Sequence, residues 1–271
     1  MKIDIISLFP EFFDAFFSHS IIKRAIEAGR LDMSVTNPRN FSHNKHGQVD
    51  DTPYGGGAGM LMMAPPIFEA VESVVSNYDN AINGTYETDE ICDEMSLIGN
   101  PGESIRRRIV FMGPTGQPFT QEKARELANY DQLILVCGHY EGVDYRVEEH
   151  LVDETISIGD YVLTGGELPA MVVVDAVARM IPGVLGAASG AQEDSFYEPL
   201  LECPQYTKPP EFRGWVVPDV LRSGHHKNIA TWRQKEALKR TRLLRPDLLE
   251  RPLTKEEVKL LKEIIAEESR L

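Results

Sequence analysis

Three short apolar runs in the middle of the chain each lead into a loop that contains glycine. The loops span residues 112–116, 137–142 and 157–170. Open α/β folds hold small molecules at the carboxyl ends of their strands, where glycine lets the backbone turn sharply or touch a ligand. Each loop taken alone is also consistent with a plain tight connection. Because three such loops lie in one half of the chain, we predict that they form one pocket.

Strands and helices are predicted to alternate over the first part of the chain. Apolar runs indicate buried strands at 2–8, 31–36, 108–111, 133–136 and 155–158. Helical spacing indicates helices at 10–28, 65–75, 120–128 and 169–180. The first of these is predicted to be one continuous helix that Gly29 ends. Such alternation is typical of an α/β domain with a largely parallel sheet.

The chain changes character after this α/β domain, which we place at 1–185. Residues 186–204 are small and flexible by composition and are predicted to form a linker. Residues 205–271 are predicted to form a small α-helical domain that contains a basic helix. Thr254 and Glu257 have the spacing of a capping box, which predicts that a last amphipathic helix begins there.

The formal net charge of −14 is unevenly distributed along the chain. Residues 77–104 contain seven acidic and no basic residues, show little periodicity, and are predicted to form a mobile acidic insertion. Residues 205–245 contain ten basic and three acidic residues, a net charge of +7. Local charge governs phosphate binding, so this stretch could bind RNA although the whole protein is acidic. The alternative is that these charges only form a solvated helix face.

Several common activities lack their motifs. The glycine run at 55–59 has Met60 where a dinucleotide-binding motif needs its last glycine, and it falls in a long loop. The chain contains no P-loop, no H-E-x-x-H and no G-x-S-x-G sequence. Its three cysteines have no metal-binding spacing, and no run has the features of a signal peptide or a membrane span. We therefore expect a cytoplasmic protein without a membrane partner.

Three polar side chains near the glycine loops could carry proton chemistry. Glu141 lies inside the second loop, and Arg179 lies late in an otherwise apolar helix, where a charge needs a partner. Asp194 follows Glu193 in the predicted linker. Simpler explanations exist, since Arg179 could interact only with the helix dipole and the linker acids could interact only with solvent.

Five motifs together resemble those of one known family. They are Gly-His-Tyr-Glu-Gly at 138–142, Ser-Ile-Gly-Asp-Tyr-Val-Leu-Thr-Gly-Gly-Glu-Leu-Pro-Ala at 157–170, Asp-Ala-Val-Ala-Arg-Met-Ile-Pro-Gly at 175–183, Glu-Asp-Ser-Phe at 193–196 and Ser-Gly-His-His at 223–226. With them the chain resembles the TrmD family of bacterial tRNA (guanine-N(1)-)-methyltransferases, of the SPOUT class, over nearly its whole length. It departs from the family pattern at His139, where some members carry arginine, and in the longer stretch at 77–104.

The resemblance implies a trefoil-knotted, parallel-sheet α/β domain followed by the small α-helical domain; periodicity does not predict the knot. It implies S-adenosylmethionine bound in a bent conformation between the glycine loops, and an obligate homodimer whose active site uses both subunits. The substrate would be the anticodon stem-loop of tRNA, with 1-methylguanosine formed immediately 3′ of the anticodon. The family pattern assigns to the cofactor Phe111, Met112, Gly113, Pro114, Gly116, Gly138, Tyr140, Glu141, Gly142, Ser157, Ile158, Gly159, Tyr161, Leu163, Gly165, Gly166 and Pro169.

The resemblance also implies three catalytic roles. Guanine N(1) carries a proton at neutral pH and becomes a nucleophile as that proton leaves. By the family pattern Asp194 is the general base, and Arg179 stabilises the negative charge that grows on the guanine oxygen. Glu141 would lie beside the cofactor, and the family's dependence on Mg²⁺ makes it a candidate metal ligand, although the sequence does not place the ion.

Three other functions compete with this interpretation. A different SPOUT methyltransferase would act on another RNA base, but the motifs at 193–196 and 223–226 disfavour it. A non-catalytic RNA-binding protein would retain RNA without consuming S-adenosylmethionine, and the presence of Asp194 and Arg179 disfavours that. A dehydrogenase would be stabilised by NAD rather than by S-adenosylmethionine.

Overall fold

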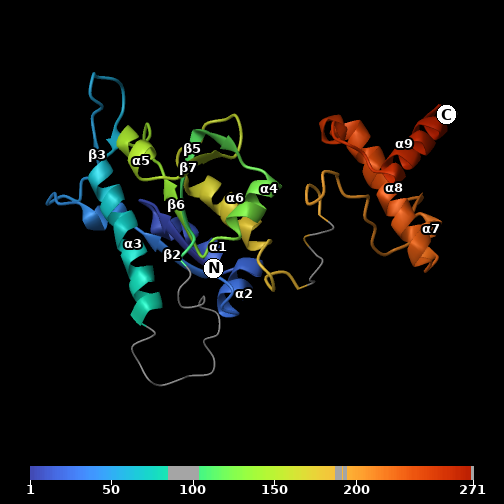
Figure 1. The fold of residues 1–271 in the computed structure, drawn as a ribbon, viewed down its shortest axis with the longest axis horizontal. Helices are drawn as coiled ribbons and strands as arrows, with labels where there is room; N and C mark the ends of the chain where they lie inside the picture. Colours follow the sequence, from blue (N-terminus) through green and yellow to red (C-terminus); the bar gives the residue numbers. More distant parts are fainter. Residues whose placement is uncertain (85–103, 187–190, 192–193, 270–271) are drawn as a thin grey trace. The chain divides into compact units, whose positions relative to one another are not determined.

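The structure, a computed structural model, describes residues 1–84, 104–186, 191 and 194–269. The chain forms two compact units, Met1–Gly186 and Ala187–Leu271 (Figure 1). Most of the predicted acidic insertion, residues 85–103, lies outside the described part of the chain.

A five-stranded sheet in which all neighbouring strands run parallel forms the centre of the first unit. The strand order is β2-β1-β6-β5-β7. The strands span Lys2–Ile6 (β1), Asp32–Thr36 (β2), Arg107–Pro118 (β5), Gln132–Cys137 (β6) and Glu154–Ser157 (β7). Central strand β6 is buried along its whole length, as expected for a parallel strand that is covered on both faces. The predicted parallel α/β sheet is confirmed.

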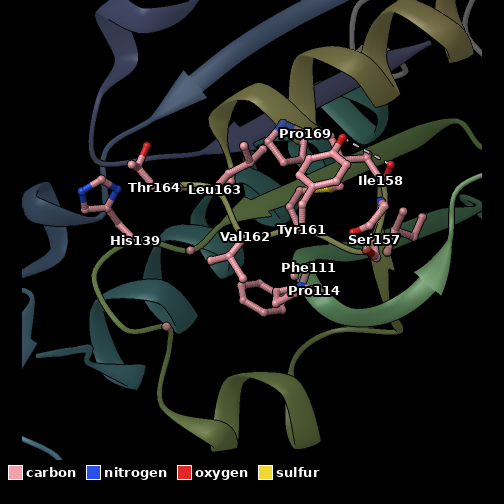
Figure 2. A pocket seen from close by; sticks show the side chains of 18 of the residues that line it. Phe111, Pro114, His139, Ser157, Ile158, Tyr161, Val162, Leu163, Thr164 and Pro169 are labelled. Carbon is pink, nitrogen blue, oxygen red and sulfur yellow. Dashed lines mark hydrogen bonds between the residues drawn. The ribbon is translucent and has the colours of Figure 1, made fainter. Parts of the chain in front are cut away.

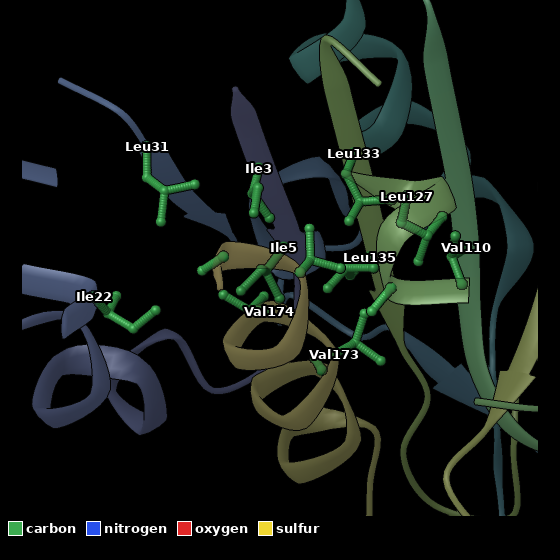
Figure 3. Packing of buried hydrophobic residues seen from close by; sticks show 14 of the residues in the cluster. Ile3, Ile5, Ile22, Leu31, Val110, Leu127, Leu133, Leu135, Val173 and Val174 are labelled. Carbon is green, nitrogen blue, oxygen red and sulfur yellow. The ribbon is translucent and has the colours of Figure 1, made fainter. Parts of the chain in front are cut away.

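Helices cover both faces of this sheet (Figure 1). Helices α2 (Ser20–Glu27), α4 (Gln121–Leu127) and α6 (Glu167–Ala178) pack on one face. Figure 3 shows Val173 and Val174 of α6 beside Ile5 and Leu135 of the sheet. Helices α3 (Ala64–Gly84) and α5 (Tyr145–His150) pack on the other face. Because the strands are parallel, their carboxyl ends lie at one edge of the covered sheet, where the glycine loops emerge.

The first predicted helix is wrong in one respect, because it is broken into three pieces. A 3₁₀ turn at Pro10–Phe13 and α1 (Asp14–Phe17) are separated from α2 by an extended His19, and Ser20 has a φ of 55°. On a continuous helix, Phe13 and Ile22 would lie about 180° apart around the axis, since each residue turns it by about 100°. The break lets both side chains enter the same core.

Other differences concern the ends and number of elements. Helix α3 continues to Gly84, so residues 77–84 are helical rather than part of a loop. Helix α5 was not predicted, and two-residue strands β3 (Asp50–Asp51) and β4 (Leu61–Met62) pair in a region predicted to be a loop or its edge. Short elements of this kind bury few apolar residues and so leave little periodicity to detect. A further 3₁₀ turn occupies Pro38–Phe41.

The second unit is mainly helical. It contains a two-stranded hairpin, β8 (Glu211–Phe212) with β9 (Trp215–Val216), and α7 (Asp219–Arg222), α8 (His226–Leu244), a 3₁₀ turn at Pro246–Leu249 and α9 (Lys255–Glu268). Its buried apolar core consists of Leu238, Leu260 and Ile264. The capping box is confirmed, because Thr254 Oγ1 accepts from the Glu257 amide and Glu257 Oε2 accepts from the Thr254 amide.

Part of the stretch predicted to be a linker packs on α8. The Leu201 amide donates to Thr241 Oγ1 at 2.9 Å, and Arg240 Nη1 donates to the Glu202 carbonyl at 3.2 Å. These bonds tie residues 201–202 to the second unit.

Candidate cofactor-binding site

The three glycine loops meet in one pocket of the first unit (Figure 2). Strands β6, β5 and β7 are parallel neighbours, so their carboxyl ends lie at the same edge of the sheet. The pocket is lined by Phe111, Met112, Gly113, Pro114, Gly138, His139, Tyr140, Glu141, Gly142, Ile156, Ser157, Ile158, Gly159, Tyr161, Val162, Leu163, Thr164, Gly165, Gly166 and Pro169. All residues that the family pattern assigns to the cofactor line it except Gly116. Their role in binding stays a prediction.

The first loop is a bulge within β5 rather than a loop after it. Met112 and Gln117 both pair with Ile156, so the residues between them leave the ladder. A Cβ on Gly116 would lie 2.5 Å from the backbone of Thr155. Gly116 is therefore needed for the close contact between β5 and β7. This contact accounts for a glycine at position 116 even though Gly116 does not line the pocket.

The second loop is held by backbone hydrogen bonds to the segment before α3. The Glu141 amide donates to the Met60 carbonyl at 3.0 Å, and the Met62 amide donates to the Gly142 carbonyl at 2.9 Å. Gly142 has a φ of 131°, a conformation that residues other than glycine rarely adopt. The chain thus turns at Gly142 while Tyr140 and Glu141 stay exposed in the pocket wall.

The third loop passes directly against the second. The Gly166 amide donates to the Gly138 carbonyl at 2.8 Å, and His139 and Gly165 form an isolated bridge. A Cβ on Gly166 would lie 2.6 Å from the Cys137 Cα, closer than real Cβ atoms approach. Glycine at this position is required by backbone contact between segments nearly thirty residues apart in sequence.

Two side chains beneath this contact are almost fully buried. Glu167, the first residue of α6, is 5% exposed and accepts from the Ser7 hydroxyl at 2.7 Å. Burial raises the pKa of the Cys137 thiol well above its usual value, and the nearby Glu167 adds to the rise. Cys137 therefore acts as a small apolar side chain of the core rather than as a nucleophile. Glu167 joins the start of α6 to the end of β1 through Ser7.

The glycine run at 55–59 lies beside Glu141. Gly59 has a φ of 81°, and a Cβ there would come within 2.4 Å of the Glu141 Cγ. The missing side chain thus leaves room for the Glu141 side chain. The run does not fit a dinucleotide-binding motif, and no local sequence pattern predicts its contact with the second loop.

Arg179 does not line the pocket. Arg179 follows the last residue of α6, ten residues after Pro169, and a rise of 1.5 Å per residue places its backbone about 15 Å further along the helix. Asp194 belongs to the second unit, where it lines a hollow with Glu198, residues 200–206, Leu221 of α7 and side chains of α8. Of the three predicted catalytic residues, Glu141 alone lies in the pocket wall of the first unit as described.

Four lining residues were absent from the sequence-based assignment. They are His139, Ile156, Val162 and Thr164. Val162 and Thr164 lie within the 157–170 motif and could have been included with it (Figure 2). His139 was noticed only as a departure from the family pattern, yet its ring packs edge-on against Phe9 at 4.9 Å and its buried Nδ1 has no hydrogen-bond partner in the described structure.

In the described ranges, no three His, Cys, Asp or Glu side chains gather closely enough to hold a metal ion. Within the same ranges, no helix has both the length and the apolar character to span a membrane.

Fold and pocket together define an α/β protein with a pocket at the carboxyl edge of a parallel sheet, where open α/β folds commonly hold their ligands. Residues 1–251 match the family described as tRNA (Guanine-1)-methyltransferase TrmD, and the chain belongs to this family. The resemblance drawn from the five motifs is confirmed.

Similar proteins agree with this assignment over nearly their whole length. A tRNA (guanine-N(1)-)-methyltransferase of Desulforamulus reducens is 54% identical over 265 residues, which cover 97% of this chain and 95% of the relative. Proteins of the same name from Dehalococcoides mccartyi and Brevibacillus brevis are 50% and 52% identical. The first covers 99% of both chains, and the second covers 97% of this chain and 98% of the relative.

Proposed function

We propose that this protein transfers a methyl group from S-adenosylmethionine to N(1) of the guanosine immediately 3′ of the tRNA anticodon. The observation that carries the proposal is the meeting of the three family loops in one pocket, in a chain that belongs to the tRNA (guanine-1)-methyltransferase family. A tRNA substrate places the reaction in the cytoplasm.

The residues of the pocket fit S-adenosylmethionine. Phe111, Leu163 and Pro169 offer apolar surface for the purine and ribose, and the glycine loops bring backbone amides and carbonyls to the same space. The exposed Glu141 carboxylate suits a cationic ligand, and the buried His139 Nδ1 is a polar atom without a partner in the described structure. When bound, the cofactor would supply an electrophilic methyl group.

The catalytic roles follow from the chemistry of guanine. Asp194 would accept the N(1) proton as general base, and the Arg179 guanidinium would stabilise the charge that grows on the guanine oxygen. Both side chains are half-buried, so neither is fully solvated before substrate binds. Among the described residues, no three histidine, cysteine or acidic side chains lie close enough together to hold a metal ion.

We also propose that the active site is shared between two subunits. Arg179 lies about 15 Å along α6 from the pocket residue Pro169, which is further than its own side chain extends. A second copy of the chain could bring its Arg179 to the pocket of the first. This supports the expected homodimer, in which each pocket is completed from the partner.

Two features of the architecture belong to the same proposal. The close passage of Gly166 over Cys137 supports a trefoil knot formed by the chain after β7. The second unit contains the whole stretch 205–245, with its net charge of +7, and nearly all of the predicted linker, and this stretch would hold the anticodon stem-loop.

The direct test is methyl transfer from labelled S-adenosylmethionine to tRNA transcripts that carry guanosine or adenosine 3′ of the anticodon. We expect label only in the guanosine transcript and 1-methylguanosine after digestion to nucleosides. Another methylated nucleoside would identify a different RNA methyltransferase, and tRNA binding without transfer would indicate the non-catalytic alternative.

A further inference from the structure

The β8–β9 hairpin of the second unit exposes two aromatic rings on one side. Phe212 and Trp215 are directly paired across the hairpin, so their side chains leave it on the same face. Their ring centroids are 6.2 Å apart, and they are 57% and 69% exposed. Large aromatic side chains are costly to leave in water, so a pair at a hairpin tip suggests a surface that a partner covers.

The turn between the two strands carries an arginine where the backbone favours a different residue. Arg213 and Gly214 have φ values of 55° and 85°, the signs required by a type I′ turn. Asn or Gly adopts the first of these positions more easily than arginine does. The Arg213 guanidinium lies 5.2 Å from the centre of the Phe212 ring, which places a cation beside the exposed aromatic pair.

The surroundings of the hairpin favour a nucleic acid as the partner. The hairpin lies within the stretch of residues 205–245, whose net charge is +7. Among the described ion pairs, none involves Lys208 or Arg213, so both charges are available to phosphates. Exposed rings combined with basic side chains are the usual means of binding unpaired bases, because every base has a face that can stack.

We infer that the hairpin is a stacking site for an unpaired RNA base, with Trp215 and Phe212 as the platform and Arg213 as the contact to the adjoining phosphate. The inference rests on the proposed function in that the RNA is taken to be the anticodon loop of tRNA. The inference adds a second source of affinity for tRNA, since base stacking on the hairpin would supplement the attraction between basic side chains and phosphates.

The experiment measures the Kd of the full-length protein for an unmodified tRNA transcript with guanosine 3′ of the anticodon, at low and at high salt. Trp215→Leu should weaken binding roughly 5- to 150-fold. The factor should be similar at both salt concentrations, because stacking releases no counterions. Trp215→Phe keeps a ring and should retain most of the affinity.

Arg213→Asn tests the contribution of the positive charge apart from that of the turn conformation. Asparagine suits the left-handed turn position at least as well as arginine, so the hairpin is preserved while the charge is removed. We expect weaker binding, with a slope of log affinity against log salt that is flatter by about 1. Val216→Thr, on the opposite face of the hairpin, is the matched control and should bind tRNA like the parent.

Fluorescence gives a second readout that does not depend on affinity. The chain has two tryptophans, and a Trp232→Phe background leaves Trp215 as the single reporter. Saturating tRNA should quench Trp215 emission if a base stacks on it. Unchanged Kd in Trp215→Leu together with unquenched Trp215 emission would overturn the inference.

Three further outcomes are distinguished by the same preparations. If Trp215→Leu changes the sedimentation of the free protein from dimer to monomer, the hairpin contacts a second copy of the chain, and the stacking site is wrong. If the parent protein does not methylate the transcript, the proposed function fails. If the parent methylates it and the hairpin variants bind as tightly as the parent, only the stacking site fails.

Discussion

The two units hold their candidate functional groups in opposite ways. In the first unit, the pocket walls are backbone segments in direct contact, and a single Cβ on Gly166 would lie 2.6 Å from the Cys137 Cα. In the second unit, the candidate groups are side chains at the surface, above a small apolar core that centres on Leu238. Small changes to the first unit should therefore abolish its function abruptly, whereas changes to the second should reduce binding by degrees.

The largest effect is expected at Asp194, the residue of the second unit that is proposed to act on the substrate. Asp194→Asn is nearly isosteric but removes the proton acceptor, so methyl transfer should fall about 10²- to 10⁴-fold. Calorimetry should show unchanged S-adenosylmethionine affinity, because the pocket is built entirely from residues of the first unit. Glu198→Gln, a change of an exposed acid nearby, is the control and should keep parental turnover. Parental turnover in Asp194→Asn would remove Asp194 from the role of base.

The next largest effect tests the backbone contact of the first unit. In Gly166→Ala the new methyl group meets the backbone of β6, which cannot move aside as a side chain could. Overpacking of this kind costs about 3 kcal/mol at the upper end of its usual range. We expect S-adenosylmethionine binding measured by calorimetry to be lost or at least strongly weakened.

Gly186→Ala is the matched control for that substitution, since a Cβ at Gly186 meets nothing within 4 Å. It should bind the cofactor like the parent. If Gly166→Ala also binds like the parent in a folded protein, the pocket walls are more adaptable than the contact between the loops implies. The contrast between the two units would then be lost.

A third prediction concerns the stability of the second unit and its dependence on pH. Hydrogen bonds from Arg251 and from the Thr254 amide and hydroxyl, of which that from Arg251 has the largest effect, together lower the pKa of Glu257 from 4.5 to about 2, against the effect of burial. A depressed carboxyl pKa stabilises the folded state above the unfolded pKa of about 4.5, and this stabilisation is lost as the pH falls toward 2.

Glu257→Gln should therefore lower the free energy of unfolding by about 2 kcal/mol at pH 7, with a difference from the parent that shrinks below pH 4.5. Thermal unfolding followed by circular dichroism across this pH range measures the difference. Glu256→Gln, at the exposed neighbouring position, is the control and should lower the free energy of unfolding at pH 7 by less than Glu257→Gln does. A constant difference between Glu257→Gln and the parent would show that the carboxylate charge is not what stabilises the start of α9.

The sequence predicts local features of both units well and distant contacts poorly. The parallel sheet follows from apolar runs such as 133–136, and the start of α9 follows from the spacing of Thr254 and Glu257. Each of these is set by residues a few positions apart. The family motifs also predict most of the residues that line the pocket, because these residues lie close together in sequence within three loops.

What could not be predicted depends on residues far apart in the chain. No local pattern shows that Gly59 makes room for Glu141, or that Gly116 is required by the neighbouring β7 backbone. The break before Ser20 is likewise set by the sheet to which both flanking segments must pack. The paired rings of the hairpin follow from strands of two residues, which are too short to produce a periodic pattern.

The smallest effect concerns the basic side chains of the second unit. If the comparison of the two units is right, each of them should contribute a small, separate amount to tRNA binding. Several basic side chains are already paired within the unit, including Lys235 with Glu267 at 2.6 Å and Arg242 with Glu268. No described ion pair involves Lys227 or Lys239, so these two should contribute more to phosphate binding. Neutralised phosphates release counterions, and each contact adds about 0.9 to the slope of log affinity against log salt.

The double variant Lys227→Ala with Lys239→Ala should therefore flatten that slope for tRNA by about 2 and raise the Michaelis constant for tRNA. S-adenosylmethionine affinity should not change, because the pocket belongs to the first unit. The double variant Lys235→Ala with Arg242→Ala is the matched control, since it removes the same charge from positions that ion pairs already engage, and it should flatten the slope less. Equal slopes for the two double variants would mean that ion pairing within the unit does not determine which lysine and arginine side chains bind phosphate. A parental slope in both would place the tRNA contacts on other side chains.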